Sequence, residues 1–400
     1  MKACFVRLQG KGIMKPNKQT VKQILNALLI AGTFAMVLYF AFQSGDITKT
    51  GEALRSVNPW WLLGGLGCFT MYVLFEGGIL QLYFRLQGAR VRVADSMRCG
   101  LIGMYYSAIT PAATGGQPMQ VFSMKKRGVS PGLTGSALAV KFFCWQCALL
   151  LSGAVAWALN TRLVADTLQQ GIWMLRLGFF LNGIAVAGVI LLAVSRNTVR
   201  ALIVFFVNLA HKLRIIKDKA KTASKFDAAL NDFHASVNLL TQHPFQFLVL
   251  FLLSLLEVLA MMSAIYFVYR GLGLNTANYV SLVTMQTMLF IAASFTPLPG
   301  ASGAQEGGFY LFFGSFFPEN IIFAAMFVWR FVTYYLSIIC GFAAVLYDGA
   351  RVTKAKNASD ARDGTDQING GNHEETALGS AVPAASDAGG AFSGGEQEGA

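Results

Sequence analysis

Two matching interruptions in the apolar sequence constrain this chain more than any other feature. They occupy residues 107–118 and residues 294–308. Each has a Thr-Pro dipeptide, Thr110-Pro111 or Thr296-Pro297, then small residues and glycines, then a Gln that opens a new apolar segment. Lipid offers no hydrogen bonds, so backbone broken in this way must be buried in protein or line a watery cavity. Paired breaks of this kind point to the substrate site of a transporter.

The rest of the chain is typical of a polytopic membrane protein. Apolar residues make up 54% of it and charged residues only 13%, whereas soluble domains average about 25% charged residues. A spanning helix needs about 20 mostly apolar residues. Long apolar runs with at most one ionisable residue occupy residues 24–42, 60–84, 133–159, 177–194, 245–269, 279–295 and 321–347. The sequence therefore predicts an all-α, polytopic transmembrane helical bundle.

The positive charge predicts the orientation. The net charge is +12, and Lys and Arg cluster in residues 1–23, 85–98, 125–127, 212–225 and 351–356. By the positive-inside rule these segments face the cytoplasm, which puts both termini of a cell-membrane protein on that side. Nucleic-acid binding explains this distribution poorly.

The same charges set the path of the two breaks. Residues 99–123 have positive clusters on both sides, so both of their ends should face the cytoplasm. Residues 279–318 should begin and end outside, because residues 321–347 must bring Arg351 back to the cytoplasm. Two broken or re-entrant hairpins entering from opposite faces are what an inverted repeat would produce. The alternative, in which each hairpin crosses fully twice, preserves the same topology.

The chain divides into three parts by composition. Residues 1–23 form a basic cytoplasmic N-terminus, and residues 24–350 form the membrane domain, with a cytoplasmic helical loop at 196–244. Residues 351–400 form an acidic tail rich in Gly and Ala, which carries too little apolar surface to fold and is expected to be disordered.

Five ionisable residues lie inside the predicted spans or breaks, namely Glu76, Lys141, Glu257, Glu306 and Arg330. Because charge in a membrane is costly, each is a functional candidate or half of a buried ion pair. We expect Glu306 to pair with Arg330. Lys141 could meet a lipid phosphate or neutralise Glu76.

Arg330 also belongs to a polar stripe. Arg330, Thr333, Tyr334, Ser337 and Gly341 share one helix face. This stripe lines either a cavity or a helix–helix contact.

Each break offers the start of a helix. Ser302 and Gln305 have the spacing of a capping box, which predicts a helix N-terminus near Ser302. Thr114 and Gln117 have the same spacing, with Gly116 as an equally good cap. Free backbone N–H groups at such termini attract phosphate. The four histidines lie outside the spans, so we expect no metal, cofactor or catalytic residues.

Four segments resemble a known family. They are Thr110-Pro111 with Gly115-Gly116-Gln117-Pro118, the Lys-Lys-x-Gly run at 125–128, Thr296-Pro297-x-Pro299-Gly300 with Gly303 and Glu306-Gly307-Gly308, and Trp329-Arg330 with Thr333-Tyr334-Tyr335. Over roughly residues 20–350 the chain resembles the lysylphosphatidylglycerol synthase transmembrane family, whose members are also called flippase-like domain proteins. Some relatives have Glu where Gln117 stands here.

The resemblance implies translocation of an anionic or aminoacylated phospholipid, such as lysyl-phosphatidylglycerol, or of a polyprenyl-phosphate lipid, between leaflets. In bifunctional members a separate cytoplasmic domain transfers lysine from tRNA. We expect that domain to be absent, so intrinsic phosphatidylglycerol lysyltransferase activity is not expected. Two alternatives are a part in lysyl-phosphatidylglycerol synthesis and a non-transporting partner of a separate synthase. A homo-oligomer is also compatible with the sequence. The substrate-binding residues predicted are Thr110, Pro111, Gly115, Gly116, Gln117, Lys141, Thr296, Pro297, Gly300, Gly303, Glu306, Arg330, Thr333 and Tyr334.

Overall fold

A computed structural model describes residues 47–169, 171–195 and 242–349, with scattered positions between 197 and 238. Within these residues the secondary structure is helical, without a strand. Five of the described helices are long and apolar enough to cross a membrane. The predicted all-α polytopic bundle is thereby confirmed. The predicted span at 24–42, most of the loop at 196–244 and the tail at 351–400 lie outside the described residues.

Four of the five long helices begin where the sequence places a proline, and α8, which follows Gly171, is the exception. They are α3 (Pro59–Leu86), α6 (Pro131–Leu159), α8 (Ile172–Val194), α11 (Pro244–Gly271) and α14 (Glu319–Arg330). The Asn58 side chain accepts a hydrogen bond from the N–H of Trp60, and the Ser130 hydroxyl accepts one from the N–H of Leu133. Proline at the first turn lacks only an N–H that would have had no helical partner there. α14 continues through a π-helical turn, η3 (Phe331–Tyr335).

Shorter helices form two hairpins between the long ones. The first is α4 (Val93–Ile109), η1 (Pro111–Ala113) and α5 (Gly116–Lys125). The second is α12 (Tyr279–Ala293), η2 (Pro299–Ala301) and α13 (Ala304–Phe313). Two further short helices are α2 (Ile47–Arg55) and α7 (Thr161–Thr167).

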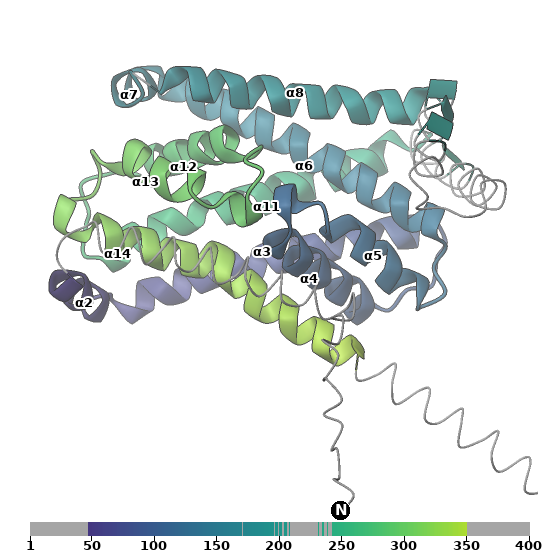
Figure 1. Cartoon of the computed structure of the whole chain (residues 1–400), viewed down its shortest axis with the longest axis horizontal. Coiled ribbons are helices and arrows are strands. Elements are labelled where there is room, and N and C mark those ends of the chain that lie inside the picture. The colour runs from purple at the N-terminus through teal and green to yellow at the C-terminus, as the bar shows by residue number, and fades with distance from the viewer. Residues whose placement is uncertain are drawn as a thin grey trace, which may run out of the picture. The chain divides into compact units, whose positions relative to one another are not determined.

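The returning arms of the hairpins are too short to cross a bilayer. α5 and α13 have 10 residues each, and ten helical residues span about 15 Å, half of the roughly 30 Å hydrocarbon layer. In Figure 1 the first hairpin opens toward the right and the second toward the left, with their tips between. This geometry supports half-depth, re-entrant hairpins over hairpins that cross fully twice.

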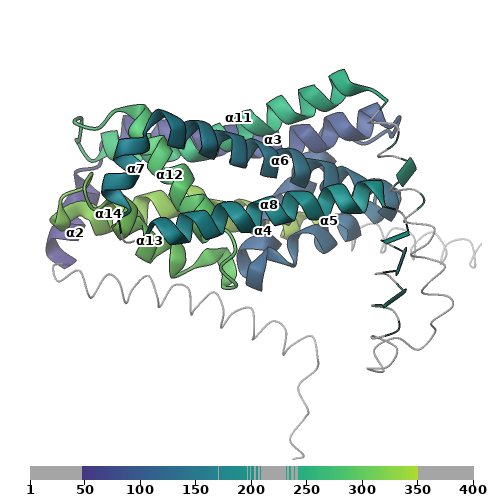
Figure 2. The ribbon, with the colours of Figure 1, turned by 90° about the horizontal axis from the view of Figure 1, so that it is seen from above.

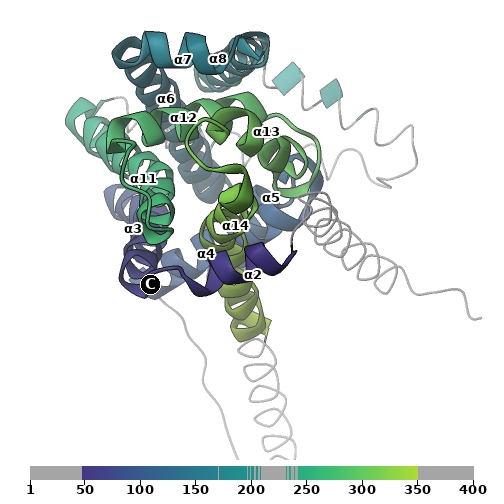
Figure 3. The ribbon, with the colours of Figure 1, turned by 90° about the vertical axis from the view of Figure 1, so that its left-hand side faces the viewer.

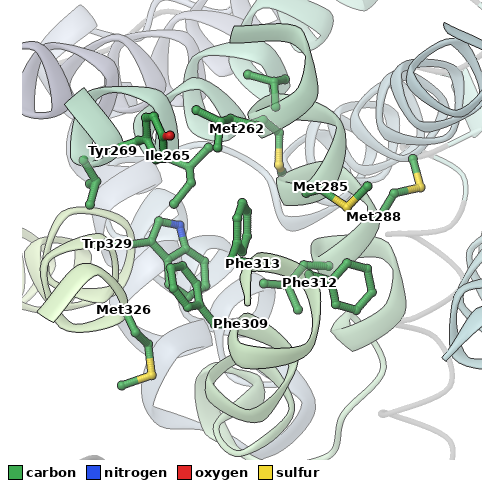
Figure 4. Packing of buried hydrophobic residues seen from close by; sticks show 14 of the residues in the cluster. Met262, Ile265, Tyr269, Met285, Met288, Phe309, Phe312, Phe313, Met326 and Trp329 are labelled. Atoms are coloured by element: carbon green, nitrogen blue, oxygen red, sulfur yellow. The ribbon is translucent and has the colours of Figure 1, made fainter. Parts of the chain in front are cut away.

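The packing brings the second hairpin into the core of the bundle. α3 and α11 pack together along their lengths (Figure 2). End-on, α12 and α13 lie between α8 and α14 (Figure 3). A buried cluster of aromatic and sulfur side chains joins α11, α12, α13 and α14, including Met262, Met285, Phe309, Phe313 and Trp329 (Figure 4). Trp329 precedes Arg330, so this cluster fixes the part of α14 that carries the charge.

The described residues divide into two units at Val345 and Leu346. The helices above belong to the first unit. The described part of the second, residues 346–349, is helical.

Candidate functional site

The tips of the two hairpins touch. The backbone N–H of Ala112, in the first break, donates a hydrogen bond to the carbonyl oxygen of Pro297, in the second, at 3.0 Å. The two Thr-Pro breaks, which are 186 residues apart in the sequence, are therefore one structural feature at the centre of the bundle.

The two tips share a backbone pattern. Each has a short 3₁₀ turn that begins with proline, at Pro111 and at Pro299. Left-handed residues follow, with φ of 49° at Ala112 and 61° at Gly300. A non-glycine residue at positive φ is uncommon and marks a constrained position. By backbone structure Pro111 therefore corresponds to Pro299. The sequence comparison had matched Pro111 with Pro297, two residues earlier.

The first break is closed by Thr110. Its hydroxyl accepts a hydrogen bond from the N–H of Gly115 at 2.9 Å and donates to the carbonyl of Tyr106. The helix cap is Gly115, so the expected caps, Thr114 and Gly116, are both wrong. A Cβ at Gly116 would overlap the Ser107 side chain and the Gly103 carbonyl of α4, so Gly116 lets the two arms of the hairpin approach closely.

The second break is closed by Glu306. Its carboxylate accepts the N–H of Gly303 at 2.6 Å, and Gly303, with φ of 85°, is the helix cap. The predicted start at Ser302 is one residue early, because the Ser302 hydroxyl donates to the carbonyl of Pro299 instead. The reciprocal acid of this cap is Glu306, not Gln305.

Glu306 and Arg330 form the predicted ion pair. Nε of Arg330 donates to Oε1 of Glu306 at 2.7 Å, and Nη2 lies 2.6 Å from the same oxygen. Nη2 also donates to the carbonyl of Gly300 at 3.0 Å. The third nitrogen, Nη1, has no hydrogen-bond partner among the described residues. Glu306 thus neutralises Arg330 and holds it against the second break, while one edge of the guanidinium stays available.

Tyr334 connects α14 to both breaks. Its hydroxyl donates to the carbonyl of Ala108, just before the first break, at 3.0 Å. Its ring lies so close to Gly300 that a Cβ there would overlap it. The Arg330 guanidinium stacks over the same ring, 4.8 Å from its centroid. The π-helical turn that contains Tyr334 is a form often found at functional sites.

A cavity of about 480 Å³ lies where the breaks meet. Its lining joins apolar groups, such as Phe290 and Leu298, to a polar wall on α14. Five predicted site residues line it, namely Thr296, Gly300, Arg330, Thr333 and Tyr334. Seven predicted residues are not among its lining and act on the backbone of the breaks or on Arg330, namely Thr110, Pro111, Gly115, Gly116, Pro297, Gly303 and Glu306.

The polar stripe has both of the functions considered for it. Arg330, Thr333, Tyr334 and Ser337 line the cavity. Gly341 instead meets α4, where an added Cβ would lie 2.6 Å from both the Leu101 carbonyl oxygen and Cβ of Tyr105. The stripe therefore faces the cavity from Arg330 to Ser337, and at Gly341 it forms a helix–helix contact with α4.

A smaller cavity of about 180 Å³ shares Ser107, Phe142 and Trp145 with the larger one. It is lined by the remaining predicted residues, Gln117 and Lys141, and by Glu76. The ammonium of Lys141 pairs with Glu76, as one of the two expectations had it, and also lies 3.5 Å from Oε1 of Glu257. Lys141 therefore already has two carboxylate partners.

Sequence reasoning missed a polar network on the opposite wall. Gln146 donates to the Asn182 side-chain oxygen at 2.9 Å, and Asn182 donates to the Ser294 hydroxyl at 3.0 Å. All three line the larger cavity. Gln305 lines it too, and its buried side-chain oxygen has no hydrogen-bond partner within the part of the chain that the structure describes. The sequence feature that could have revealed this network is the amide side chain of Gln146 and of Asn182, each inside an apolar run. An uncharged amide in such a run is a weaker indication of a site than a charged residue.

Two comparisons with known proteins match this chain over its membrane region. A family model described as the lysylphosphatidylglycerol synthase TM region matches residues 24–341. A UPF0104 membrane protein of Archaeoglobus fulgidus is 26% identical over 282 residues, which cover 70% of this chain and 83% of that protein. Both breaks, both cavities and the ion pair lie inside the matched region.

Proposed function

This chain belongs to the lysylphosphatidylglycerol synthase transmembrane family, and on that premise we propose that it moves an anionic or aminoacylated phospholipid, such as lysyl-phosphatidylglycerol, between the leaflets of the cell membrane. The observation that carries this proposal is the cavity at the meeting point of the two breaks. It combines an available guanidinium edge with apolar walls, which is the combination that a phosphate with attached acyl chains requires.

Arg330 is the proposed contact for the phosphate. A guanidinium N–H donates charge-assisted hydrogen bonds to phosphate oxygens, and among the described residues Nη1 is the Arg330 nitrogen left free to do so. Thr333, Ser337 and Gln305 line the same space. They suit the hydroxyl groups of a glycerol headgroup, because hydroxyls both donate and accept.

The remaining charges take different roles from those first expected. Glu306 is 2% exposed and its carboxylate already binds Arg330 and Gly303, so we assign it to holding Arg330 in place and not to direct contact with the lipid. Lys141 is occupied by two carboxylates, so the phosphate is assigned to Arg330 alone.

The positions of the hairpins fit movement between leaflets. Each returning arm reaches about half of the bilayer, and the tips meet at Ala112 and Pro297. A headgroup at this point is at mid-depth, where transporters built from broken helices bind their substrates. The positive loops put both termini in the cytoplasm, so the first hairpin opens to the cytoplasm and the second to the outside.

Reconstitution tests the proposal. The full chain is placed in liposomes that contain a fluorescent phosphatidylglycerol, its lysyl form or a phosphatidylcholine, and a membrane-impermeant quencher reports which leaflet holds the label. We expect exchange of the phosphatidylglycerol lipids well above that of protein-free liposomes, and slower exchange of phosphatidylcholine. Exchange equal to protein-free liposomes for every headgroup would refute the transport function and favour a non-transporting partner of a separate synthase.

A further inference from the structure

Three ionisable side chains from three helices meet beside the central cavity. Glu76 comes from α3, Lys141 from α6 and Glu257 from α11. The Lys141 ammonium contacts the Glu76 carboxylate, and Oε1 of Glu257 lies 3.5 Å from the same nitrogen. Both carboxylates are therefore within ion-pair distance of one ammonium. The ion pair of Glu306 with Arg330 has one acid for one base, whereas this cluster has two acids for one base.

Glu257 is the least satisfied member. It is 0% exposed, and neither carboxylate oxygen makes a hydrogen bond to the described residues. The ionisable groups that act on it from the helices packed against α11 are Glu76 and Tyr72 of α3 and Lys141 of α6. Lys141 supplies the single positive charge of this set. The cluster thus carries an uncompensated negative charge inside the bundle when both carboxylates are ionised.

A buried charge of this kind is costly. An unpaired acid near the centre of a membrane helix costs about 2.5–3.5 kcal/mol even on the scales that give the lowest values. Two carboxyl groups that share a site avoid the cost by keeping one proton between them. Such a proton belongs to the pair and not to either residue. With one proton bound, the cluster is neutral, and a carboxyl O–H supplies the donor that the oxygens of Glu257 lack.

We propose that Glu76, Glu257 and Lys141 form a proton-binding site that holds one exchangeable proton between the two carboxyl groups at neutral pH. Water reaches the site through the smaller cavity, which Glu76 and Lys141 line together with Gln117 and Gln120. Protonation takes a proton from this water onto a carboxylate oxygen, and release returns it.

The site is placed to affect the larger cavity. Tyr72, Ser107 and Trp145 line both cavities, so a change of charge at the cluster alters the electrostatics of the space in which the headgroup would lie. The cluster is thereby coupled electrostatically to the space proposed for lipid movement. The coupling rests on the proposed function, whereas the binding of the proton does not.

Infrared spectroscopy of the purified full chain tests proton binding without any transport assay. A protonated carboxyl group absorbs at a higher frequency than a carboxylate and shifts in D₂O. We expect such a band at neutral pH in the wild-type protein. Glu76→Gln and Glu257→Gln should each abolish it, because either change leaves one acid for one ammonium. Lys141→Met should enlarge it, because two acids without a base each need a proton.

Glu319→Gln is the matched control, because Glu319 is exposed in the first turn of α14. It should leave the band unchanged. Both glutamine variants mimic the neutral carboxyl and should elute as folded protein. A wild-type spectrum without the band, or a band that persists in both glutamine variants, would overturn the proposal. If lipid exchange then fails while the band behaves as expected, the transport function is wrong and the proton site stands.

Discussion

The backbone N–H of Ala112 lies 3.0 Å from the carbonyl oxygen of Pro297, to which it donates a hydrogen bond. This single contact joins the tips of two hairpins that enter from opposite ends of the bundle (Figure 1). It places the strained residues of the two breaks beside each other, on the wall of the same cavity.

Cross-linking tests this contact. In a background without the six native cysteines, Ala112→Cys combined with Pro297→Cys should form a disulfide on mild oxidation, since a disulfide needs Cα atoms about 4.4–6.8 Å apart. The control pair is Ala112→Cys with Leu311→Cys. Leu311 lies seven residues further along α13 than Ala304, about 10 Å from the tip, and should not cross-link. Equal yields for the two pairs would show that the tips do not meet.

The pair of Glu306 and Arg330 predicts a strong coupling in stability. Glu306→Gln and Arg330→Gln should each lower the free energy of unfolding in detergent by about 3–5 kcal/mol, because each leaves a buried charge without its partner. The double variant Glu306→Gln with Arg330→Gln should lose much less than the sum. Losses that simply add would mean that the two side chains do not interact.

Exchanging the two charges should restore only part of this stability. Glu306→Arg combined with Arg330→Glu re-forms an ion pair and should be more stable than either half alone. It also removes the acceptor for the Gly303 N–H and the donor to the Gly300 carbonyl. Full recovery in thermal unfolding would contradict the capping role assigned to Glu306.

Gly300 should tolerate no side chain. Its φ is 61°, where an L-residue costs about 1–2 kcal/mol, and a Cβ would also overlap the Tyr334 ring. We therefore expect Gly300→Ala to lower the thermal unfolding midpoint. Gly307→Ala is the control, because Gly307 lies in α13 and an added Cβ meets nothing within 4 Å. A similar midpoint for both variants would show that Tyr334 does not pack on this glycine.

Asn182 should contribute to stability although the apolar run that holds it, residues 177–194, contains no charged residue. Asn182→Leu leaves Gln146 and Ser294 without their shared partner, which should cost about 1–3 kcal/mol per buried polar group left unsatisfied. Gly183→Ala, the next residue, adds a Cβ with nothing within 4 Å and should be nearly neutral. Unchanged unfolding of Asn182→Leu in detergent would mean that the network contributes nothing to stability.

The sequence was most informative where polar groups interrupt apolar runs. The breaks, the pairing of Glu306 with Arg330 and the polar stripe that begins at Arg330 could be predicted, because a charge or a broken backbone in lipid must find a partner. Whether the stripe lines a cavity or a helix–helix contact was left open by the sequence. The order of apolar runs likewise predicted α3, α6, α8, α11 and α14.

What the sequence did not reveal depends on which helices become neighbours. Glu257 joins Lys141 only because α11 packs against both α3 and α6, and the meeting of Asn182 with Gln146 depends in the same way on α6 packing against α8. Helical periodicity predicts which residues share one face of a helix, but it does not predict which other helix packs against that face. The observed helix caps, Gly115 and Gly303, differ by one residue from the predicted caps. The reason is that side chains outside the expected motifs, Thr110 and Glu306, accept the hydrogen bonds from the N–H groups of these glycines.

We propose that a lipid headgroup passes through the cavity that Thr333 lines. Thr333→Cys in the cysteine-free background should support leaflet exchange of fluorescent phosphatidylglycerol until a bulky thiol reagent is attached, since the reagent fills the space that the headgroup needs. Leu311→Cys, on the exposed side of α13, is the matched control and should keep its rate after the same treatment. We expect exchange by modified Thr333→Cys to fall to the level of protein-free liposomes. Exchange at an undiminished rate after complete modification would contradict it.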